Sequence, residues 1–310
     1  MDLHTGVYLQ TMTWKEIEER LKTNDTIIIP VGSTEAHGPH ACIGEDTFLV
    51  TRMAEAVAEK IGGTVAEPIW YGSHPFHHLG MPGTIIVPED VFNGQLRAIM
   101  AGLWNMGFRK QIFLNGHGQE YVIPNAIHQF AKRYQVPGMF INVQWYHAVP
   151  EHFNTKEKGG PYDTQFIHAD EVETSWSLAL FPEHIKMEDA VDTSPKAYLP
   201  DGHIDKSGNL MRRPICWYGQ VGCGATEVVA TPEGVVGKAT LATAEKAIPG
   251  VEDFLDYLEK LCNDILEKFP PGELPPTEDM TQRKKEDIEA VLKGAFEEGG
   301  RSIYTIAYPP

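Results

Sequence analysis

Short apolar runs alternate with amphipathic stretches through the first two thirds of the chain, and this alternation constrains the fold most strongly. The run at 26–31, Thr-Ile-Ile-Ile-Pro-Val, is apolar and rich in β-branched residues, which is typical of a buried strand. Strands that alternate with helices form a parallel sheet covered on both faces, so we predict an α/β fold, a three-layer αβα sandwich with a mostly parallel sheet. The predicted strands are 26–31, 64–68, 111–114 and 139–143, and the predicted helices are 14–21, 47–61, 91–106 and 121–134.

The C-terminal part of the chain divides at a cluster of prolines. One more helix is predicted to run to about Lys268, and the segment 269–276 contains four prolines, which indicates a linker. The stretch 279–298 is charged and weakly amphipathic, as expected for an appended helix that packs on a neighbouring subunit rather than in the core. We therefore divide the chain into a main α/β domain, 1–268, and a Pro-rich linker with a C-terminal extension, 269–310.

Charge and composition exclude several classes of protein. The formal net charge is −17 and no basic stripe is present, which argues against nucleic-acid and membrane-surface partners. No apolar run approaches the length of a membrane span, and the first residues lack the pattern of an export signal. The four cysteines are scattered, as expected for free thiols in a reducing compartment. We expect a soluble cytoplasmic protein.

The loop after the predicted strand 26–31 carries a dense set of metal-binding side chains. Glu35 and His37 are two residues apart, and an extended backbone directs both to the same side. Asp46 precedes the predicted helix 47–61, where a helix N-cap is the simplest interpretation. Its position shortly after Glu35 and His37 also suits a carboxylate that bridges two cations. Glu45 is expected to be a solvated neighbour.

Two further clusters follow predicted strands or open helices. His117 lies between two glycines directly after the predicted strand 111–114; a tight turn explains the glycines but not the accessible imidazole. In the segment 168–175, acids in the first turn of a helix favour the helix dipole, which accounts for Asp170 and Glu171. Glu173 lies three residues before Trp176 on the face expected to be buried, where an unpaired carboxylate requires a cationic partner.

Several aromatic residues are candidates for substrate contacts. The loop 71–83 contains His74, His77 and His78, and histidines in such loops are mostly surface residues rather than metal ligands. Trp145 follows the predicted strand 139–143 and forms either a wall of the substrate pocket or part of the core.

These clusters together, in their order and separation, resemble the signature of the creatininase (creatinine amidohydrolase) family over roughly residues 7–268. The resemblance is carried by Gly32-Ser33-x-Glu35-x-His37-Gly38-Pro39-His40 with Asp46, by Asn115-Gly116-His117-Gly118, by His168 with Glu173-Thr174-Ser175, and by Gly234-Val235-Val236-Gly237.

The resemblance implies an αβα-layered enzyme with two divalent metal ions, zinc with manganese or iron as alternatives, in a homo-oligomer such as a hexamer. A mixed nitrogen and carboxylate shell suits these ions, which lower the pKa of a bound water and polarise a substrate oxygen. His168 matches the family residue that passes a proton to the leaving group, a task that suits an imidazole. The implied metal ligands are Glu35, His37, Asp46, which bridges the ions, His117 and Glu173.

The substrate implied by the resemblance is a small polar ring. Gly118 and Gln119 replace a tyrosine and a ligand glutamate of creatininase proper, which argues against creatinine. The histidine loop and the long tail are similar to the family branch that hydrolyses 3-dehydro-scyllo-inosose, a diketo-inositol, at a carbon–carbon bond to give a keto acid in inositol catabolism. Two alternatives stay open: an amidohydrolase of cyclic amides such as creatinine, and a non-catalytic metal- or ligand-binding protein on the same scaffold.

Overall fold

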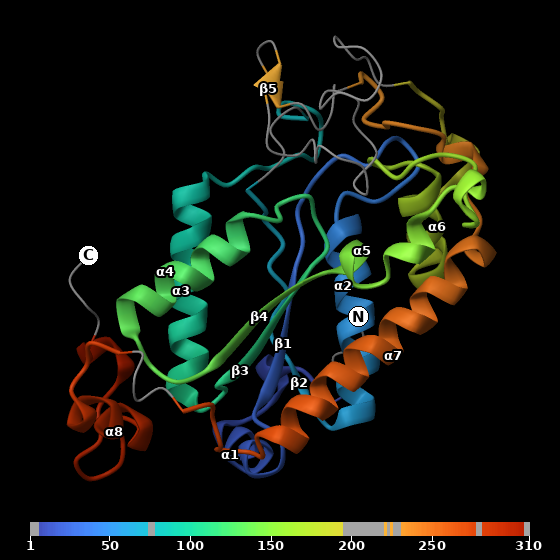
Figure 1. Ribbon diagram of the computed structural model, residues 1–310. Coiled ribbons are helices and arrows are strands. Elements are labelled where there is room, and N and C mark those ends of the chain that lie inside the picture. Colours follow the sequence, from blue (N-terminus) through green and yellow to red (C-terminus); the bar gives the residue numbers. More distant parts are fainter. Residues whose placement is uncertain are drawn as a thin grey trace.

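The computed structural model describes residues 6–73, 78–194, 220–221, 224–225, 231–276 and 281–306. A four-stranded sheet forms its centre, in the order β2-β1-β3-β4, and all of its neighbouring strands are parallel. This arrangement confirms the predicted α/β class (Figure 1). The strands are β1 (Thr26–Val31), β2 (Thr64–Val65), β3 (Lys110–Asn115) and β4 (Met139–Gln144), with a separate antiparallel pair, β5 (Gln220–Val221) and β6 (Gly224–Ala225).

Helices cover both faces of the central sheet. On one face lie α2, α6 and α7, and on the other lie α3 and α4 (Figure 1). In the part of the chain that is described, no helix is both long enough and apolar enough to cross a membrane. The helices are α1 (Trp14–Thr23), α2 (Glu45–Ile61), α3 (Glu89–Met106), α4 (Val122–Tyr134), α5 (Trp145–Ala148), α6 (Glu171–Leu180), α7 (Ala244–Lys268) and α8 (Lys285–Lys293).

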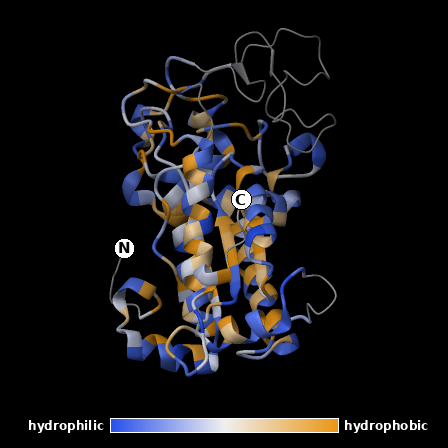
Figure 2. Ribbon diagram, turned by 90° about the vertical axis from the view of Figure 1, so that its left-hand side faces the viewer, coloured by the Kyte–Doolittle hydropathy of each residue, from blue (hydrophilic) through white to orange (hydrophobic). Residues whose placement is uncertain are grey.

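Two hydrophobic cores lie on either side of the sheet because successive strand residues face opposite sides. In β1, Ile28 joins the core under α2 and α7, whereas Ile27 and Ile29 join the core under α3 and α4. The middle residues of β1 and β3, Ile-Ile-Ile and Ile-Phe-Leu, are accordingly apolar (Figure 2). The strand 26–31 has its predicted bounds, and the other helices and strands predicted before residue 268 have ends within two residues of the prediction, except that the predicted strand 64–68 is confined to β2. The predicted helix 279–298 corresponds to the shorter α8, Lys285–Lys293.

The C-terminal extension packs on its own chain. Val291 of α8 is 1% exposed, and both Ile303 and Ile306 are buried in the core under α3 and α4. The side chain of Arg283 donates a hydrogen bond to the backbone oxygen of Arg133 at 2.6 Å. The expectation that this helix lies outside the core is therefore wrong, while the division of the chain at residue 268 stays an interpretation of the sequence.

A buried ion pair attaches the linker to the start of the sheet. Lys110, at the beginning of β3, is fully buried, and its Nζ lies 2.5 Å from Asp25 Oδ1 and 3.1 Å from the backbone oxygen of Pro270. The other carboxylate oxygen of Asp25 accepts a hydrogen bond from the backbone N–H of Gly272 at 3.1 Å. The buried side chains of Lys110 and Asp25 thus hold the linker against the start of the sheet.

We predict that Lys110→Met lowers the free energy of unfolding by about 3–5 kcal/mol, because it leaves the carboxylate of Asp25 buried without its cation. Urea denaturation of the variant and the wild type measures this difference. The double variant Asp25→Asn/Lys110→Met removes both charges and should recover part of the loss. A single variant within about 0.5 kcal/mol of the wild type, the usual range for surface substitutions, would show that the pair does not stabilise the fold.

Candidate metal centre

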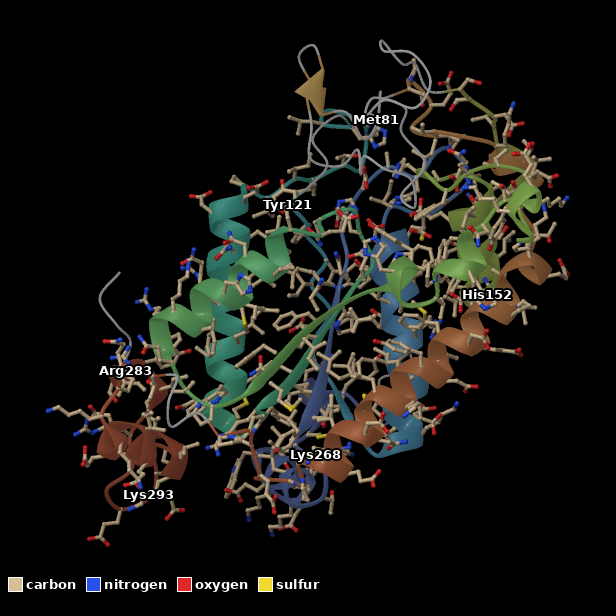
Figure 3. All side chains as sticks on the ribbon, viewed as in Figure 1. Met81, Tyr121, His152, Lys268, Arg283 and Lys293 are labelled. Atoms are coloured by element: carbon tan, nitrogen blue, oxygen red, sulfur yellow. The ribbon has the colours of Figure 1, made fainter. Side chains whose placement is uncertain are left out.

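The five predicted metal ligands and His168 come together at the carboxyl ends of β1 and β3, the usual position of active sites in parallel α/β sheets. Residues 31 and 115 are paired in the sheet register, so the loops that follow them start side by side. The N-termini of α2 and α6 face the same region. Figure 3 marks this end of the molecule by Met81 and Tyr121, with Lys268 at the opposite end.

The first group of donor atoms surrounds His117. Its Nδ1 lies 2.9 Å from Asp46 Oδ2 and 3.3 Å from Glu35 Oε2. All three side chains are buried, with 4% or less of each residue exposed. Their donor atoms are close enough to hold one metal ion.

The second group surrounds His37. Its Nε2 lies 3.5 Å from Asp46 Oδ1, 3.8 Å from Glu173 Oε2 and 3.4 Å from Glu45 Oε2. Asp46 therefore belongs to both groups, with Oδ1 in the second and Oδ2 in the first. This division of its two oxygens is what a carboxylate that bridges two cations requires.

Two glycines permit these loops to approach α2. A Cβ atom on Gly32 would lie 2.5 Å from the backbone of Thr47, and one on Gly116 would lie 2.3 Å from the backbone oxygen of Asp46. Only glycine fits at such distances. The ends of β1 and β3 thereby reach the first turn of the helix that carries Asp46.

The predicted helix cap at Asp46 is wrong, because α2 begins at Glu45 and its N-cap is Gly44. Glu45 is also not solvated: it is 1% exposed, and its Oε1 accepts a hydrogen bond from the hydroxyl of Ser177. The sequence contained the signal, since Glu45 lies four residues before the buried Leu49 and hence on the same face of the helix.

Glu173 is positioned by the turn that precedes α6. Asp170 is the N-cap of this helix and accepts hydrogen bonds from the backbone N–H groups of Val172 and Glu173. It therefore caps the helix directly, in addition to the predicted favourable interaction with the helix dipole. Ala169 adopts a left-handed conformation with φ of 48°, unusual for a residue with a side chain. Its N–H donates to Glu173 Oε2 at 2.5 Å, which holds this oxygen towards the site.

His168 lies at the edge of both groups. Its Nε2–H donates to the backbone oxygen of Ala36 at 2.9 Å, and its Nδ1 lies 3.8 Å from Glu173 Oε2. The distance from its Nε2 to Glu35 Oε1 is 4.0 Å. The imidazole is thus oriented by the backbone and stands beside the candidate ligands.

The predicted substrate-binding residues have different positions. His78 is fully buried, and its Nδ1 lies 2.8 Å from Glu35 Oε1, so it orients a candidate ligand. Trp145 is fully buried in an aromatic cluster with Phe153 and Trp176, which favours the core alternative over a pocket wall. His74 and His77 lie outside the described residues.

Gln119 links the loops around the site. Its amide Nε2 donates to the backbone oxygen of Gly32 at 3.1 Å, and its Oε1 accepts from the N–H of Ser73 at 3.1 Å. The side chain is fully buried, and both of its polar atoms bond to backbone groups. Gln119 thus links its own loop by hydrogen bonds to the loops that contain Gly32 and Ser73.

The charges at the site are unbalanced in favour of anions. Burial opposes a charge on His37, but the carboxylates of Asp46, Glu45 and Glu173 outweigh it and raise the pKa of His37 well above its usual range. Burial, together with the carboxylate of Glu45, raises the pKa of Glu173 well above its usual range. Burial raises the pKa of Glu45 to about 7, although His37 opposes this effect. A site in which carboxylates crowd one another in this way is suited to bind cations.

The tautomer of His37 supports the same conclusion. Its Nδ1 lies 3.1 Å from the backbone oxygen of Glu35, which can only accept, so Nδ1 carries the proton of the neutral ring. In that neutral form the lone pair of Nε2 faces the carboxylates. Among the described residues, His37 Nε2, Glu35 Oε2 and Glu45 Oε2 are buried without a hydrogen-bond partner. A lone pair aimed at carboxylates is repulsive unless a cation lies between them, so the donor set fits divalent metal ions.

Comparison with known proteins identifies the family. The family model described as creatininase, creatinine amidohydrolase, matches residues 10–262. The 3-dehydro-scyllo-inosose hydrolase of Thermotoga maritima is 67% identical over 305 residues, which cover 98% of each chain. A crystal structure of creatinine amidohydrolase superposes with a TM-score of 0.68 at 25% identity, over 86% of this chain and 98% of the other. A Zn-Zn type creatininase mutant superposes with a TM-score of 0.67 at 24% identity, over 86% of this chain and 99% of the other. The chain belongs to the creatininase family of hydrolases.

Proposed function

We propose that this chain is a two-metal hydrolase that opens the ring of 3-dehydro-scyllo-inosose. The observation that carries the substrate assignment is the 67% identity to the Thermotoga maritima enzyme of that name along nearly the whole of both chains. Creatinine is the weaker candidate, because the superposed creatinine amidohydrolase is only 25% identical. Gln119 also fastens loops where creatininase proper has the ligand glutamate.

Two groups of side chains are proposed to hold the metal ions. Glu35, His117 and Asp46 hold one ion, and His37, Asp46 and Glu173 hold the other. The support is the division of the two Asp46 oxygens between two imidazoles. When bound, the ions activate water and polarise a substrate carbonyl. Imidazole with carboxylate suits zinc, with manganese or iron as alternatives.

The substrate is suited to hydrolysis at a carbon–carbon bond. The two ring carbonyls of 3-dehydro-scyllo-inosose lie on either side of one carbon. Addition of water to one carbonyl is followed by cleavage of the bond to that middle carbon. The attacked carbon becomes a carboxylic acid, and the electron pair of the broken bond is stabilised as an enolate by the second carbonyl. Protonation of the middle carbon completes the uptake of one water and gives an open-chain keto acid.

His168 is the proposed proton carrier in this reaction. It is 7% exposed and stands beside both donor groups, and the hydrogen bond from its Nε2 to Ala36 fixes the ring. Its Nδ1 is therefore the nitrogen that takes up a proton and delivers it to the carbon released by cleavage. A cytoplasmic location and a homo-oligomeric assembly stay predictions from the sequence.

We predict that the metal-loaded protein converts 3-dehydro-scyllo-inosose into a product heavier by one water and leaves creatinine unchanged. Mass spectrometry of parallel reactions measures both. Turnover of creatinine alone would support the cyclic-amide alternative, and turnover of neither would support the non-catalytic one.

His168→Gln provides the control for catalysis: we expect it to keep its metal and to lose roughly 10²- to 10⁴-fold in turnover, the usual contribution of a general acid or base.

We predict that Asp46→Asn retains almost no metal after dialysis, because both ions lose the carboxylate that they share. Glu173→Gln should retain about one ion per chain instead of about two, because only one group loses a ligand. Elemental analysis by mass spectrometry measures both contents. Equal metal contents in the two variants would argue against a bridging role for Asp46.

A further inference from the structure

Glu45 is a buried acid of the site that the five implied ligands leave unexplained. It is 1% exposed, and its Oε2 lies 3.4 Å from His37 Nε2 without a hydrogen-bond partner among the described residues. The hydroxyl of Ser177 donates to the other oxygen, Oε1, and so turns Oε2 towards His37. This carboxylate is held in place on one side and directed into the site on the other.

The distances around His37 are those of ligands that share one ion. Two donors on one metal ion are about 3.1 Å apart when neighbouring in octahedral geometry, as manganese prefers, and about 3.4 Å apart in tetrahedral geometry. The oxygens of Glu45 and Asp46 lie 3.4 Å and 3.5 Å from His37 Nε2. The distance to Glu45 is the shorter of the two, so Glu45 is placed at least as well as the shared ligand.

A histidine that binds a metal ion is neutral, and a neutral His37 cannot form an ion pair with Glu45. The proton of a neutral His37 is on Nδ1, bonded to the backbone oxygen of Glu35, so Nε2 has a lone pair rather than a hydrogen to offer. Nε2 itself has no hydrogen-bond partner among the described residues. Two acceptors that face each other need a third, positively charged group between them.

We propose that Glu45 is a further metal ligand, which gives the His37 ion three carboxylates and biases this position towards a hard cation such as Mn²⁺. The inference rests on the two-metal function proposed above. The group around His117 has one imidazole and two carboxylates, whereas the group around His37 has one imidazole and three. Carboxylate oxygens favour manganese relative to zinc, for which imidazole is a better ligand. The two positions are therefore chemically different.

The test uses Glu45→Gln, which removes one charge from the site and keeps the shape of the side chain. Glu55→Gln is the matched control, since Glu55 is a buried acid of the same helix that accepts a hydrogen bond from Tyr8 outside the site. Each metal-free protein is titrated with Mn²⁺ and with Zn²⁺ in a calorimeter. Thermal unfolding of the metal-free proteins measures whether the substitution affects the fold.

We expect wild type and Glu55→Gln to bind two Mn²⁺ per chain. Glu45→Gln should bind one Mn²⁺ as before and the other roughly 10- to 100-fold more weakly, the range for loss of a group that supports a metal site. The loss of Zn²⁺ affinity should be smaller. The Tm of metal-free Glu45→Gln should not fall, because removal of a carboxylate relieves repulsion from Asp46 and Glu173.

Two Mn²⁺ sites in Glu45→Gln with affinities within about twofold of wild type would overturn the inference and leave the two-metal function standing. A lowered Tm with unchanged Mn²⁺ binding would overturn it in favour of a structural role. Fewer than two sites in wild type would instead overturn the two-metal function itself. If Glu45→Gln does not fold, Glu45→Asp carries the same test, because it keeps the charge but withdraws the carboxylate from His37.

Discussion

The structure depends on a surplus of buried negative charge at the carboxyl ends of β1 and β3. Glu35, Glu45, Asp46 and Glu173 are all at least nine-tenths buried, and their oxygens crowd two imidazoles. Burial of ionised carboxylates is unfavourable unless a cation or a proton balances them. Within the described residues these carboxylates form ion pairs with histidines and with no lysine or arginine, so divalent ions are the balancing charges that the donor set suits.

The surrounding fold brings these side chains together and then fixes their orientation. Gly32 and Gly116 permit two loops to touch α2, and the strained backbone at Ala169 directs its N–H towards Glu173. His78 and Ser177 each make a close contact with one oxygen of a candidate ligand, Glu35 and Glu45 respectively. Such outer contacts orient metal ligands and increase their affinity. The orientation of the candidate ligands therefore depends on residues outside the sequence motifs as well as on the motifs.

The sequence predicted the sheet and its helices because β-branched runs and helical spacing are local signals. It also predicted which motif residues meet, since loops after parallel strands emerge at one edge. It missed Glu45, because the helix was expected to start two residues later and Glu45 was therefore assigned to solvent. The buried packing of Ile303 and Trp145 was not predictable from composition, because it depends on contacts between segments distant in sequence. The histidine loop at 74–77 lies outside the described residues.

Anomalous diffraction from crystals grown with Mn²⁺ or Zn²⁺ tests the central claim most directly. We expect two anomalous peaks, one on each side of the Asp46 carboxylate, the first beside His117 and the second beside His37. A single peak, or two peaks of which neither contacts Asp46, would contradict it. Absence of any peak at this edge of the sheet would mean that protons, and not metal ions, balance the buried carboxylates.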